Sequence, residues 1–385
     1  MSVAKTVLIL GGGVGGLVAA NRLRKALPSQ HRVILVEREA SHVFAPSLLW
    51  LMVGARTLPS ISRGFERLKR KGIDVIRGEV EAIDPERRSV VVSGQVLPGD
   101  YVVVALGADF CPEAVPGLAQ GGHTFYTPTG AEALRVALGE FKSGRLLILT
   151  AAPAYKCPAA PYEAAMLIEA ELRKRGVRDR THIDFFAAEA GPLGVAGPEV
   201  SRGVRTLVES RGIGYHPEHQ VAAVDPGARR ARFSNDVEAD YDLLVYVPGH
   251  RPPQAVAGAG LLGESGGISV DRHTLATGFE GVYAIGDVTS IPLKIGKPLP
   301  KAGVFAHAQA EVVARSIGRA VTGRGQPAEF NGHGGCFVET GGGRAGFGSG
   351  DFYAEPMPYV TLRGSNRFWH VGKVLLEKTW LWRWF

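Results

Sequence analysis

Residues 6–16 read TVLILGGGVGG, a short aliphatic run followed by a glycine-rich turn, and this stretch decides the fold. The aliphatic run predicts a buried strand over Thr6 to Leu10. Downstream, the apolar spacing predicts a helix from Leu17 to about Leu27 and a second strand over Arg32 to Val36. Strand, helix and strand in this order predict a βαβ unit with a parallel sheet.

The glycines of this turn carry the first functional signal. Gly11, Gly13 and Gly16 match the pattern G-x-G-x-x-G, and Glu37 stands at the end of the second strand. Glycines let a pyrophosphate approach the backbone and the helix N-terminus, and the carboxylate can accept hydrogen bonds from ribose hydroxyls. We therefore predict that this unit binds a dinucleotide.

Composition bounds the class of protein. The chain has 385 residues, which suggests two or three domains, and its 45% hydrophobic and 21% charged residues exclude disorder and collagen-like repeats. A formal net charge of +7 suits an anionic partner, either nucleic acid or phospholipid headgroups. Three cysteines are too few for a disulfide-built secreted fold. The sequence has neither an apolar run of about 18 residues, as a spanning helix requires, nor a cleavable signal peptide.

Two later segments have the pattern of buried parallel strands that end at a ligand. Residues 100–108 read DYVVVALGA and residues 281–287 read GVYAIGD. Both resemble strand ends of flavoproteins with two dinucleotide-binding domains, in which the late aspartate holds the ribityl chain and phosphates of FAD. The resemblance implies that the first nucleotide site holds FAD, with contacts from Ala105, Gly107, Gly286 and Asp287.

In such flavoproteins a second Rossmann unit is inserted in the first and usually binds a nicotinamide. Here we expect a strand over Arg145 to Thr150, a helix from about Tyr162 to Arg175, and a strand over Ile183 to Ala187 that ends near Glu189. The loop between the first strand and the helix reads AAPAYKCPAAP, without a glycine. Because Cβ atoms and prolines block a phosphate there, we predict that the nicotinamide site is lost and that NAD(P)H is not the electron donor.

The predicted architecture is therefore an α/β fold with two Rossmann-type domains, the second inserted in the first. We place the two parts of the FAD-binding domain at residues 1–118 and 246–320 and the second domain at residues 119–245. Residues 321–385 form a C-terminal segment with a membrane-associating tail.

Two cysteines stand out. Cys157 lies in the glycine-free loop, and Cys336 follows in a glycine-rich segment. Most free cysteines are small buried hydrophobes, and that interpretation stays open for either one alone. A thiol at a helix N-terminus beside Lys156 is expected to have a lowered pKa, which makes Cys157 a candidate thiolate. We interpret Cys111 as structural.

Around these cysteines the chain resembles the sulfide:quinone oxidoreductase and flavocytochrome c sulfide dehydrogenase group, over essentially its whole length. The resemblance rests on the N-terminal glycine motif, Gly286-Asp287 and the stretches YKCPAAPYE (155–163), LPKAG (299–303), 331–343 around Cys336, and GKVLLEK (372–378). It implies that Cys157 and Cys336 face each other across the flavin as a disulfide or sulfur-bridged pair. Hydrosulfide attacks one sulfur, two electrons pass to FAD, and the product is sulfane sulfur or polysulfide.

The resemblance also implies roles for other residues. Glu163 and Lys301 are candidates for proton handling or for stabilising the reduced flavin, the alternatives being an ordinary first-turn helix acid and a solvated loop lysine. Phe337 and Leu376 are expected to line a quinone site. Further residues expected to contact FAD are Pro46, Val80, Gly303 and Lys373, of which the last is alternatively a lysine that meets lipid headgroups.

Three departures from the family pattern limit what carries over. Residues 123–126 read HTFY and lack the third cysteine of many quinone-reducing members. Residues 44–48 read FAPSL and offer no thiol for a covalent flavin link, so we expect non-covalent FAD. Residues 193–195 read LGV and lack a histidine that some members carry.

The C-terminal tail predicts the location of the protein. Trp369, Trp380, Trp382 and Trp384 are interleaved with Arg367, Lys373, Lys378 and Arg383. A short aromatic and cationic segment suits a membrane interface, so we predict peripheral, monotopic attachment to the cell membrane, with the side left open. Packing of the tail on its own core is the alternative, and single-stranded nucleic acid is disfavoured as a partner.

Together these features predict an FAD-dependent enzyme that oxidises sulfide and reduces a membrane quinone, with no metal site. The alternatives are a sulfide dehydrogenase that passes electrons to a cytochrome c subunit, a type 2 NADH:quinone dehydrogenase, and a non-catalytic flavin redox sensor. A homo-oligomer stays open.

Overall fold

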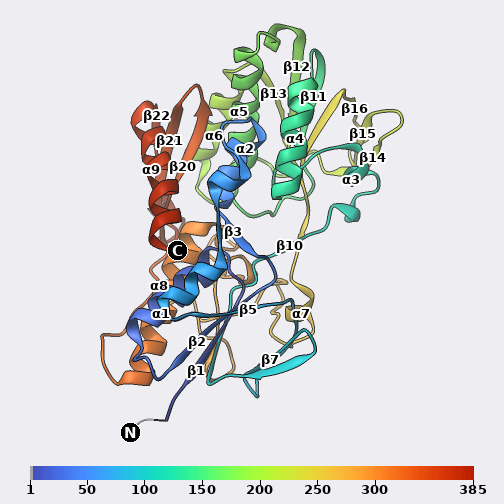
Figure 1. Ribbon diagram of the computed structural model, residues 1–385. Helices are drawn as coiled ribbons and strands as arrows, with labels where there is room; N and C mark the ends of the chain where they lie inside the picture. Colours follow the sequence, from blue (N-terminus) through green and yellow to red (C-terminus); the bar gives the residue numbers. More distant parts are fainter. Residues whose placement is uncertain (1–2) are drawn as a thin grey trace.

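The computed structural model describes residues 3–385, in which two Rossmann-type units lie one above the other with a C-terminal layer along one side (Figure 1). The first unit is built on a five-stranded parallel sheet in the order β19-β9-β1-β2-β5. Its strands are β1 (Thr6–Leu10), β2 (Arg32–Glu37), β5 (Asp74–Arg77), β9 (Tyr101–Val104) and β19 (Val282–Ala284). Since β19 pairs with β9 from far along the chain, the chain returns to this sheet after building the second unit.

Both faces of this sheet are covered, which explains its continuous apolar strands. Val7 and Ile9 face the packed helices α1 (Val14–Ala26) and α8 (Gly303–Thr322). Leu8 and Leu10 face the other layer. That layer consists of the antiparallel strands β6 (Val80–Asp84), β7 (Ser89–Val92) and β8 (Gln95–Pro98) with the short helix α7 (Gln254–Ala257).

The second unit is built on a four-stranded parallel sheet in the order β13-β12-β11-β17. Its strands are β11 (Gly144–Thr150), β12 (Thr181–Phe186), β13 (Ile213–His216) and β17 (Leu243–Val247). Its helices are α4 (Pro128–Glu140), α5 (Ala160–Lys174) and α6 (Pro198–Glu209). An antiparallel sheet of β14 (Val221–Asp225), β15 (Arg230–Phe233) and β16 (Glu238–Asp240) lies at its edge, next to the short helix α3 (Leu118–Gly121).

Short elements connect the two units. The helix α2 (Leu48–Met52) belongs to the first part of the chain but packs against α4 and α5 of the second unit. Two small antiparallel pairs are β3 (Ser41–Val43) with β4 (Ser62–Gly64), and β10 (Asp109–Phe110) with β18 (His250–Arg251).

The C-terminal layer contains the antiparallel sheet β20 (His333–Gly341), β21 (Arg344–Asp351) and β22 (Tyr359–Asn366), followed by α9 (Arg367–Arg383). β20 packs on α5, and α9 packs on β21. The far end of α9 reaches the first unit, where the Trp384 carbonyl accepts a hydrogen bond from Asn21 of α1. Figure 1 shows this layer along one side of both units.

The predicted α/β fold with two Rossmann-type units is confirmed by these two parallel sheets. The first helix begins at Val14 instead of Leu17, because Gly15 and Gly16 form part of its first turn. The strand predicted to end at Ala187 ends at Phe186, and the helix predicted from Tyr162 begins at Ala160. The exact domain boundaries stay a prediction.

The interpretation of the C-terminal tryptophans is wrong in one respect. The tail forms the helix α9, and residues four apart share a helix face, so Trp380 and Trp384 point inward together and are 6% and 4% exposed. Trp382 lies on the opposite face and is 80% exposed. None of the helices within residues 3–385 is long and apolar enough to cross a membrane.

Candidate active site

The glycine turn after β1 has two glycines that cannot be replaced and one that leaves space. A Cβ on Gly11, which has a φ of 96°, would lie 2.5 Å from the Ala105 carbonyl oxygen. A Cβ on Gly16 would lie 1.8 Å from the Gly11 carbonyl oxygen, so only glycine permits this approach of helix and strand. A Cβ on Gly13 would meet nothing within 4 Å. The turn therefore has an open face where a phosphate group can approach the backbone.

Helix geometry favours an anion at the same place. Glu37 closes the turn because its Oε2 accepts a hydrogen bond of 2.5 Å from the Gly12 backbone N–H. α8 starts beside the start of α1, since a Cβ on Gly303 would lie 3.4 Å from Val14. Two helix N-termini with unpaired N–H groups thus converge on the glycine turn, and these residues fit the pyrophosphate of a dinucleotide.

The ends of β9 and β19 lie beside this turn. Ala105 continues the strand pairing to Leu10, and Gly107 has a φ of 71° with nothing within 4 Å of a Cβ position. After β19, Gly286 also has a positive φ, and its N–H donates to Gln309 of α8 at 2.7 Å. A small pocket follows, lined among others by Gly286, Asp287, Thr289, Lys301, Phe305 and Gln309.

Asp287 and Lys301 share this pocket. Burial raises the pKa of the Asp287 carboxyl, while Lys156 and Lys301 lower it. Lys301 Nζ donates to the backbone carbonyls of Asp287 and Thr289 at 2.5 and 3.0 Å, and burial lowers its pKa. The alternative of a solvated loop lysine is therefore wrong.

Two further residues expected at FAD lie in local turns and edges. Pro46 lies in the 3-10 turn Ala45–Ser47 that leads into α2, and Val80 is the half-buried first residue of β6. Their contact with FAD stays a prediction.

Cys157 occupies a strained and well-anchored position in the loop between β11 and α5. Its φ is 53°, a left-handed conformation that costs a non-glycine residue about 1–3 kcal/mol. Its N–H donates to the Lys301 carbonyl at 2.6 Å, and its own carbonyl accepts from Ala160 at 2.8 Å. Tyr126 OH donates to the preceding carbonyl, that of Lys156, at 2.9 Å. These bonds fix the thiol against the pocket of the first unit.

The predicted lowering of the Cys157 pKa is wrong. Burial raises the pKa of this thiol well above its usual value, and Cys336 and Glu163 raise it further, whereas Lys373 lowers it. The Nζ of Lys156 lies 4.3 Å from the centre of the Phe110 ring, and its interaction with Cys157 does not outweigh the burial of the thiol. Cys157 precedes the helix cap Ala159 by two residues and therefore lies outside the first turn of α5.

The structure brings Cys157 and Cys336 into one electrostatic cluster, although 336 − 157 = 179 positions separate them. Both thiols are free. Cys336 lies on β20, exposed as a residue, yet the protein around its sulfur desolvates it and raises its pKa to about 11, with Glu163 adding to the rise and Lys373 opposing it. The two cysteines therefore share the same neighbouring charges.

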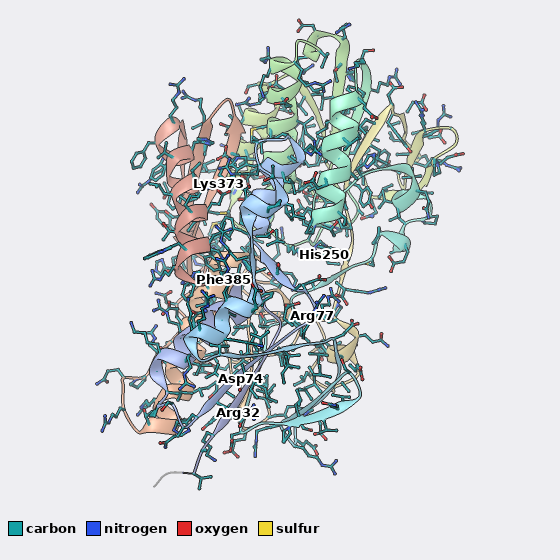
Figure 2. The ribbon with its side chains drawn as sticks, in the orientation of Figure 1. Arg32, Asp74, Arg77, His250, Lys373 and Phe385 are labelled. Carbon is teal, nitrogen blue, oxygen red and sulfur yellow. The ribbon has the colours of Figure 1, made fainter. Side chains whose placement is uncertain are left out.

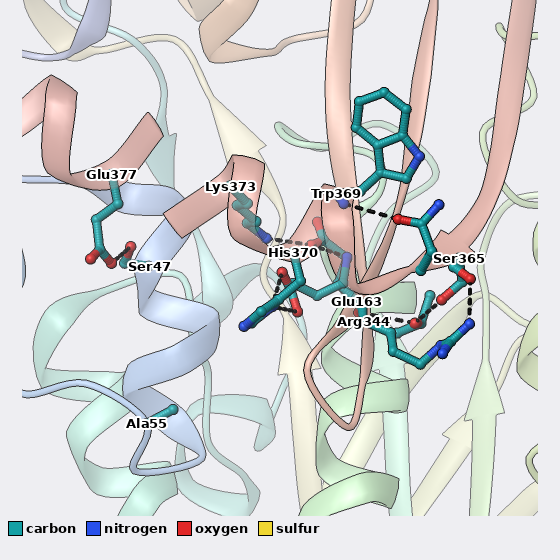
Figure 3. A network of polar contacts seen from close by, with 12 residues as sticks. Ser47, Ala55, Glu163, Arg344, Ser365, Trp369, His370, Lys373 and Glu377 are labelled. Carbon is teal, nitrogen blue, oxygen red and sulfur yellow. Dashed lines mark hydrogen bonds and ion pairs between the residues drawn. The ribbon is translucent and has the colours of Figure 1, made fainter. Parts of the chain in front are cut away.

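Glu163 and Lys373 supply those charges. Lys373 Nζ lies 2.6 Å from Glu163 Oε2, and the side chains are 4% and 2% exposed (Figure 3). Burial acts to lower the pKa of Lys373, but Glu163 and Glu339 outweigh it, so the pKa is raised. The alternatives of an ordinary first-turn acid and of a headgroup lysine are wrong for these two residues. The side chain of Lys373 extends from α9 toward α2 (Figure 2). Its Nζ lies 5.1 Å from the centre of the Trp50 ring.

Two residues of this cluster were missed by sequence reasoning. Glu339 donates its backbone N–H to Glu163 at 2.8 Å, and its carboxylate lies 3.0 and 3.1 Å from His370 Nδ1. Burial raises the pKa of Glu339. Local spacing gave no signal for Glu339, because it lies three residues after Cys336 on the strand β20 and residues three apart on a strand face opposite sides. His370 precedes Lys373 by three residues, one turn of α9, but no helix was predicted there.

The residues expected at a quinone site lie at the junction of β20 and α9. The Phe337 ring packs against the Phe347 ring with centres 5.0 Å apart, and a Cβ on Gly372 would lie 3.0 Å from it. Leu376 lies one helical turn after Gly372 and is 44% exposed. Their contact with a quinone stays a prediction.

The corresponding site of the second unit is filled by its own side chains. Glu189, the acid after β12, accepts hydrogen bonds from Thr150 Oγ1 at 2.8 Å, from Tyr162 OH at 2.6 Å and from Tyr155 OH. These three donors occupy the carboxylate that follows β12, and the loss of the nicotinamide site stays a prediction. The occupied carboxylate is the structural counterpart of the missing glycines.

Comparison with known proteins agrees with this arrangement. The model of the pyridine nucleotide-disulphide oxidoreductase family matches residues 5–310, and the chain belongs to this family. It is an FAD-binding oxidoreductase, as the glycine turn and the late aspartate predict.

Within the family, the relatives confirm the resemblance drawn from the sequence. The chain is 27% identical over 406 residues to a sulfide-quinone reductase of Aquifex aeolicus (strain VF5), covering 99% of this chain and 91% of the relative. It is 25% identical over 367 residues to a mitochondrial sulfide:quinone oxidoreductase of Mus musculus, covering 91% and 79%. The X-ray structure of the sulfide:quinone oxidoreductase from Aquifex aeolicus matches with a TM-score of 0.90 at 26% identity, covering 99% of this chain and 91% of that chain.

Proposed function

We propose that this protein oxidises sulfide to sulfane sulfur or polysulfide at Cys157 and Cys336 and passes the electrons through FAD to a quinone. The observation that carries the proposal is the cluster that joins these two cysteines from different units with Glu163 and Lys373. The relatives named above are sulfide:quinone oxidoreductases.

The chemistry starts from the oxidised cysteine pair. Hydrosulfide forms a bond to one cysteine sulfur and the bond between the cysteines breaks, which leaves a persulfide on one and a thiolate on the other. A second sulfide removes the sulfane sulfur, so that each oxidised HS⁻ yields one sulfur atom, one proton and two electrons. The two reduced cysteines that remain re-form the bond between them by giving up two electrons, for which FAD would supply the acceptor when bound. Lys373 favours the thiolate form of both cysteines.

We assign the FAD contacts to the glycine turn, Glu37, Asp287 and the N-termini of α1 and α8, with Lys301 beside the cysteine loop. Among the described residues, Cys111 is the one cysteine outside the pair. It interacts with Glu113 and Arg251 and not with the glycine turn. This supports non-covalent binding.

Electron entry from NADH is disfavoured by the second unit. Glu189 is occupied by Tyr155, Tyr162 and Thr150, and the preceding loop carries prolines where a nicotinamide-binding unit needs glycines. These observations argue against a type 2 NADH:quinone dehydrogenase.

We further propose that the outer face of α9 rests on a lipid bilayer. This outer face consists of Phe368, Val371, Leu375 and Trp382, which are 71%, 52%, 60% and 80% exposed. Their helical spacing forms one apolar stripe, and the exposed Lys378 and Arg383 on the same helix suit phospholipid headgroups. Peripheral attachment at this face would place the Phe337 and Leu376 region near a lipid-soluble quinone.

The deciding experiment is anaerobic addition of sulfide and, separately, of NADH to the holoenzyme while flavin absorbance is followed. Sulfide is expected to bleach the flavin within a turnover and a quinone analogue to restore it, whereas NADH leaves it oxidised. Bleaching by NADH alone would replace the proposal with the dehydrogenase alternative.

A further inference from the structure

The Glu163–Lys373 pair sits where the proposed chemistry releases protons, but it has no direct access to water. Glu163 acts electrostatically on both cysteine thiols. Its side chain is 2% exposed and that of Lys373 is 4% exposed. Each hydrosulfide oxidised to sulfur loses one proton with its two electrons, and each quinone reduced to quinol takes up two. A proton taken up by Glu163 must therefore cross the protein around this pair.

Glu339 and His370 lie between the pair and the surface. Glu339 is bonded to Glu163 through its backbone N–H, and its carboxylate is 1% exposed. His370 Nδ1 meets both oxygens of that carboxylate at 3.0 and 3.1 Å, and the His370 side chain is 28% exposed. One end of this arrangement is thus the buried Glu163–Lys373 pair, and the other is the partly exposed His370. Figure 3 shows Lys373, Glu163 and His370 side by side.

Glu163 and Glu339 form ion pairs with other residue types than the remaining buried glutamates do. Four glutamates are buried in the described chain, at positions 163, 169, 339 and 377. Glu169 pairs with arginines at positions 173, 178 and 211, and Glu377 pairs with Arg56 and the exposed Lys378. Arginine keeps its proton in proteins, whereas lysine and histidine can release theirs. Near the cysteines the acids are paired with Lys373 and His370 instead.

The neighbours in this cluster include one aromatic ring and three titratable groups. The Trp50 ring covers the cluster from α2, with its centre 5.8 Å from the His370 ring and 5.1 Å from Lys373 Nζ. The titratable groups that act on Glu339 are Lys373 and His370 of α9 and Glu163 of α5. Burial raises the pKa of Glu339, so its protonated form is more accessible than that of an exposed glutamate.

We propose that Glu339 and His370 carry protons between the buried Glu163–Lys373 pair beside the cysteines and the solvent at α9. On the way out, an S–H bond breaks at the cysteines as an O–H bond of Glu163 forms. The O–H bond of Glu163 then breaks as an N–H bond of Lys373 forms, while another N–H bond of Lys373 breaks as an O–H bond of Glu339 forms, so Lys373 stays an ammonium. An O–H bond of Glu339 then breaks as the Nδ1–H bond of His370 forms, and Nε2 gives a proton to water. The reverse order brings protons in, and no electrons move. The proposal rests on the proposed function for its direction of flow.

The test uses stopped-flow reduction of the holoenzyme in weak buffer with a pH indicator. We compare the unmodified protein with His370→Asn and Glu339→Gln, and with His307→Asn as control. His307 is a good match because it also pairs with a glutamate, Glu311 at 3.4 Å, and its side chain is 35% exposed, but it lies on α8 away from the cysteines. FAD content and the unfolding temperature are recorded for each variant.

The expected result is a proton exchange about 100-fold slower in His370→Asn, the lower end of what positioned general acids and bases contribute. Added imidazole restores the rate in His370→Asn, since it replaces the missing group. The control behaves like the unmodified protein. Unchanged exchange in both cluster variants overturns the proposal, and so does a slowing that imidazole leaves unchanged, because that marks a structural role.

A second reductant separates this proposal from the proposed function. Dithionite supplies electrons without sulfide chemistry. Its own oxidation to bisulfite releases protons, which a blank with free FAD subtracts, and the remaining proton exchange depends on the path. Slow exchange in His370→Asn with dithionite, combined with no reaction of the unmodified protein with sulfide, supports the path and refutes sulfide oxidation. Normal exchange with dithionite and normal sulfide bleaching refutes the path only.

Discussion

The ammonium group of Lys373 lies 2.6 Å from the carboxylate of Glu163, although 210 positions separate the two residues. The contact joins α9 at the end of the chain to α5 of the second unit, beside a cysteine loop that is itself bonded to Lys301. Three distant parts of the sequence therefore meet at one charged and buried point.

The first prediction concerns the stability of this pair. Glu163→Gln leaves a buried ammonium without its partner, and breaking a buried pair in this way costs about 3–5 kcal/mol. Urea unfolding should show this loss. The double variant Glu163→Gln with Lys373→Met removes the unpaired charge and is expected to recover most of the stability. An unchanged unfolding midpoint in the single variant would contradict the prediction.

The second prediction concerns the cysteines. Cys157→Ser and Cys336→Ser are expected to bind FAD normally and to lose flavin bleaching by sulfide, because neither can form the oxidised pair. Cys111→Ser serves as the matched control, since Cys111 lies against Gly249 and takes no part in the cluster. Flavin absorbance under anaerobic sulfide measures the effect, and bleaching that survives either of the first two changes rules the pair out.

The third prediction separates two glycines of the same turn. Gly13→Ala adds a Cβ with nothing within 4 Å, so the protein should fold and bind FAD more weakly. Gly16→Ala places a Cβ 1.8 Å from the Gly11 carbonyl oxygen, so the βαβ unit itself should be destabilised. Circular dichroism and FAD content distinguish the outcomes. Equal FAD content in Gly13→Ala and the unmodified protein would argue against a phosphate at this face.

The fourth prediction concerns the outer face of α9. The double variant Leu375→Gln and Trp382→Gln removes two exposed apolar side chains, each worth about 1.5–3 kcal/mol when fully buried. We expect sedimentation with anionic liposomes to weaken by about tenfold or more. Val96→Gln is the control, because Val96 is 65% exposed on β8 away from this helix. Equal binding of both variants would exclude this face as the attachment site.

The fifth prediction concerns pH and the C-terminal helix. Trp380 Nε1 donates to His42 Nε2 at 3.1 Å, and His42 Nδ1 meets the Gly12 carbonyl at 3.0 Å. Burial lowers the pKa of His42 from 6.5 to about 4. Below pH 6.5, His42 is protonated in the unfolded chain, whereas in the folded protein it stays neutral down to about pH 4. The free energy of unfolding therefore falls as the pH drops from 6.5 to about 4.

The size of this effect follows from the pKa difference and is about 3 kcal/mol. Urea unfolding between pH 7 and pH 4 measures it. His42→Gln should lose less stability over the same window, and the residual slope belongs to other buried histidines such as His250, whose pKa burial also lowers to about 4. A variant with the same slope as the unmodified protein would refute the assignment to His42.

Local sequence patterns predicted most of the fold because they depend on neighbouring residues. The strand over Thr6 to Leu10, its glycine turn and the acid at Glu37 lie within one βαβ unit, where periodicity and turn chemistry decide the structure. The absence of glycine in the loop before α5 likewise predicted a changed second site, which Glu189 now fills with internal hydrogen bonds.

Properties that depend on packing could not be predicted in this way. The pKa of Cys157 is raised by burial, by Cys336 and by Glu163, and the rise is opposed by Lys373, a residue 216 positions away (373 − 157). The partners of Glu339 and His370 likewise come from different elements, so no local pattern marked them. The side chains of the C-terminal tail were wrongly predicted because α9 buries the charged Lys373 and Glu377, whereas a surface helix usually exposes its charged residues.

This inverted helix also complicates a common experiment. Cutting the chain before Arg367 would remove the outer face of α9. It would also remove Lys373 beside the cysteines, the buried Trp380, and Trp384, whose ring packs against Arg22 of α1. A shortened protein would then lose vesicle affinity and turnover together, for two unrelated reasons. Separating membrane attachment from catalysis therefore requires single substitutions on the outer face of α9 in the full-length chain.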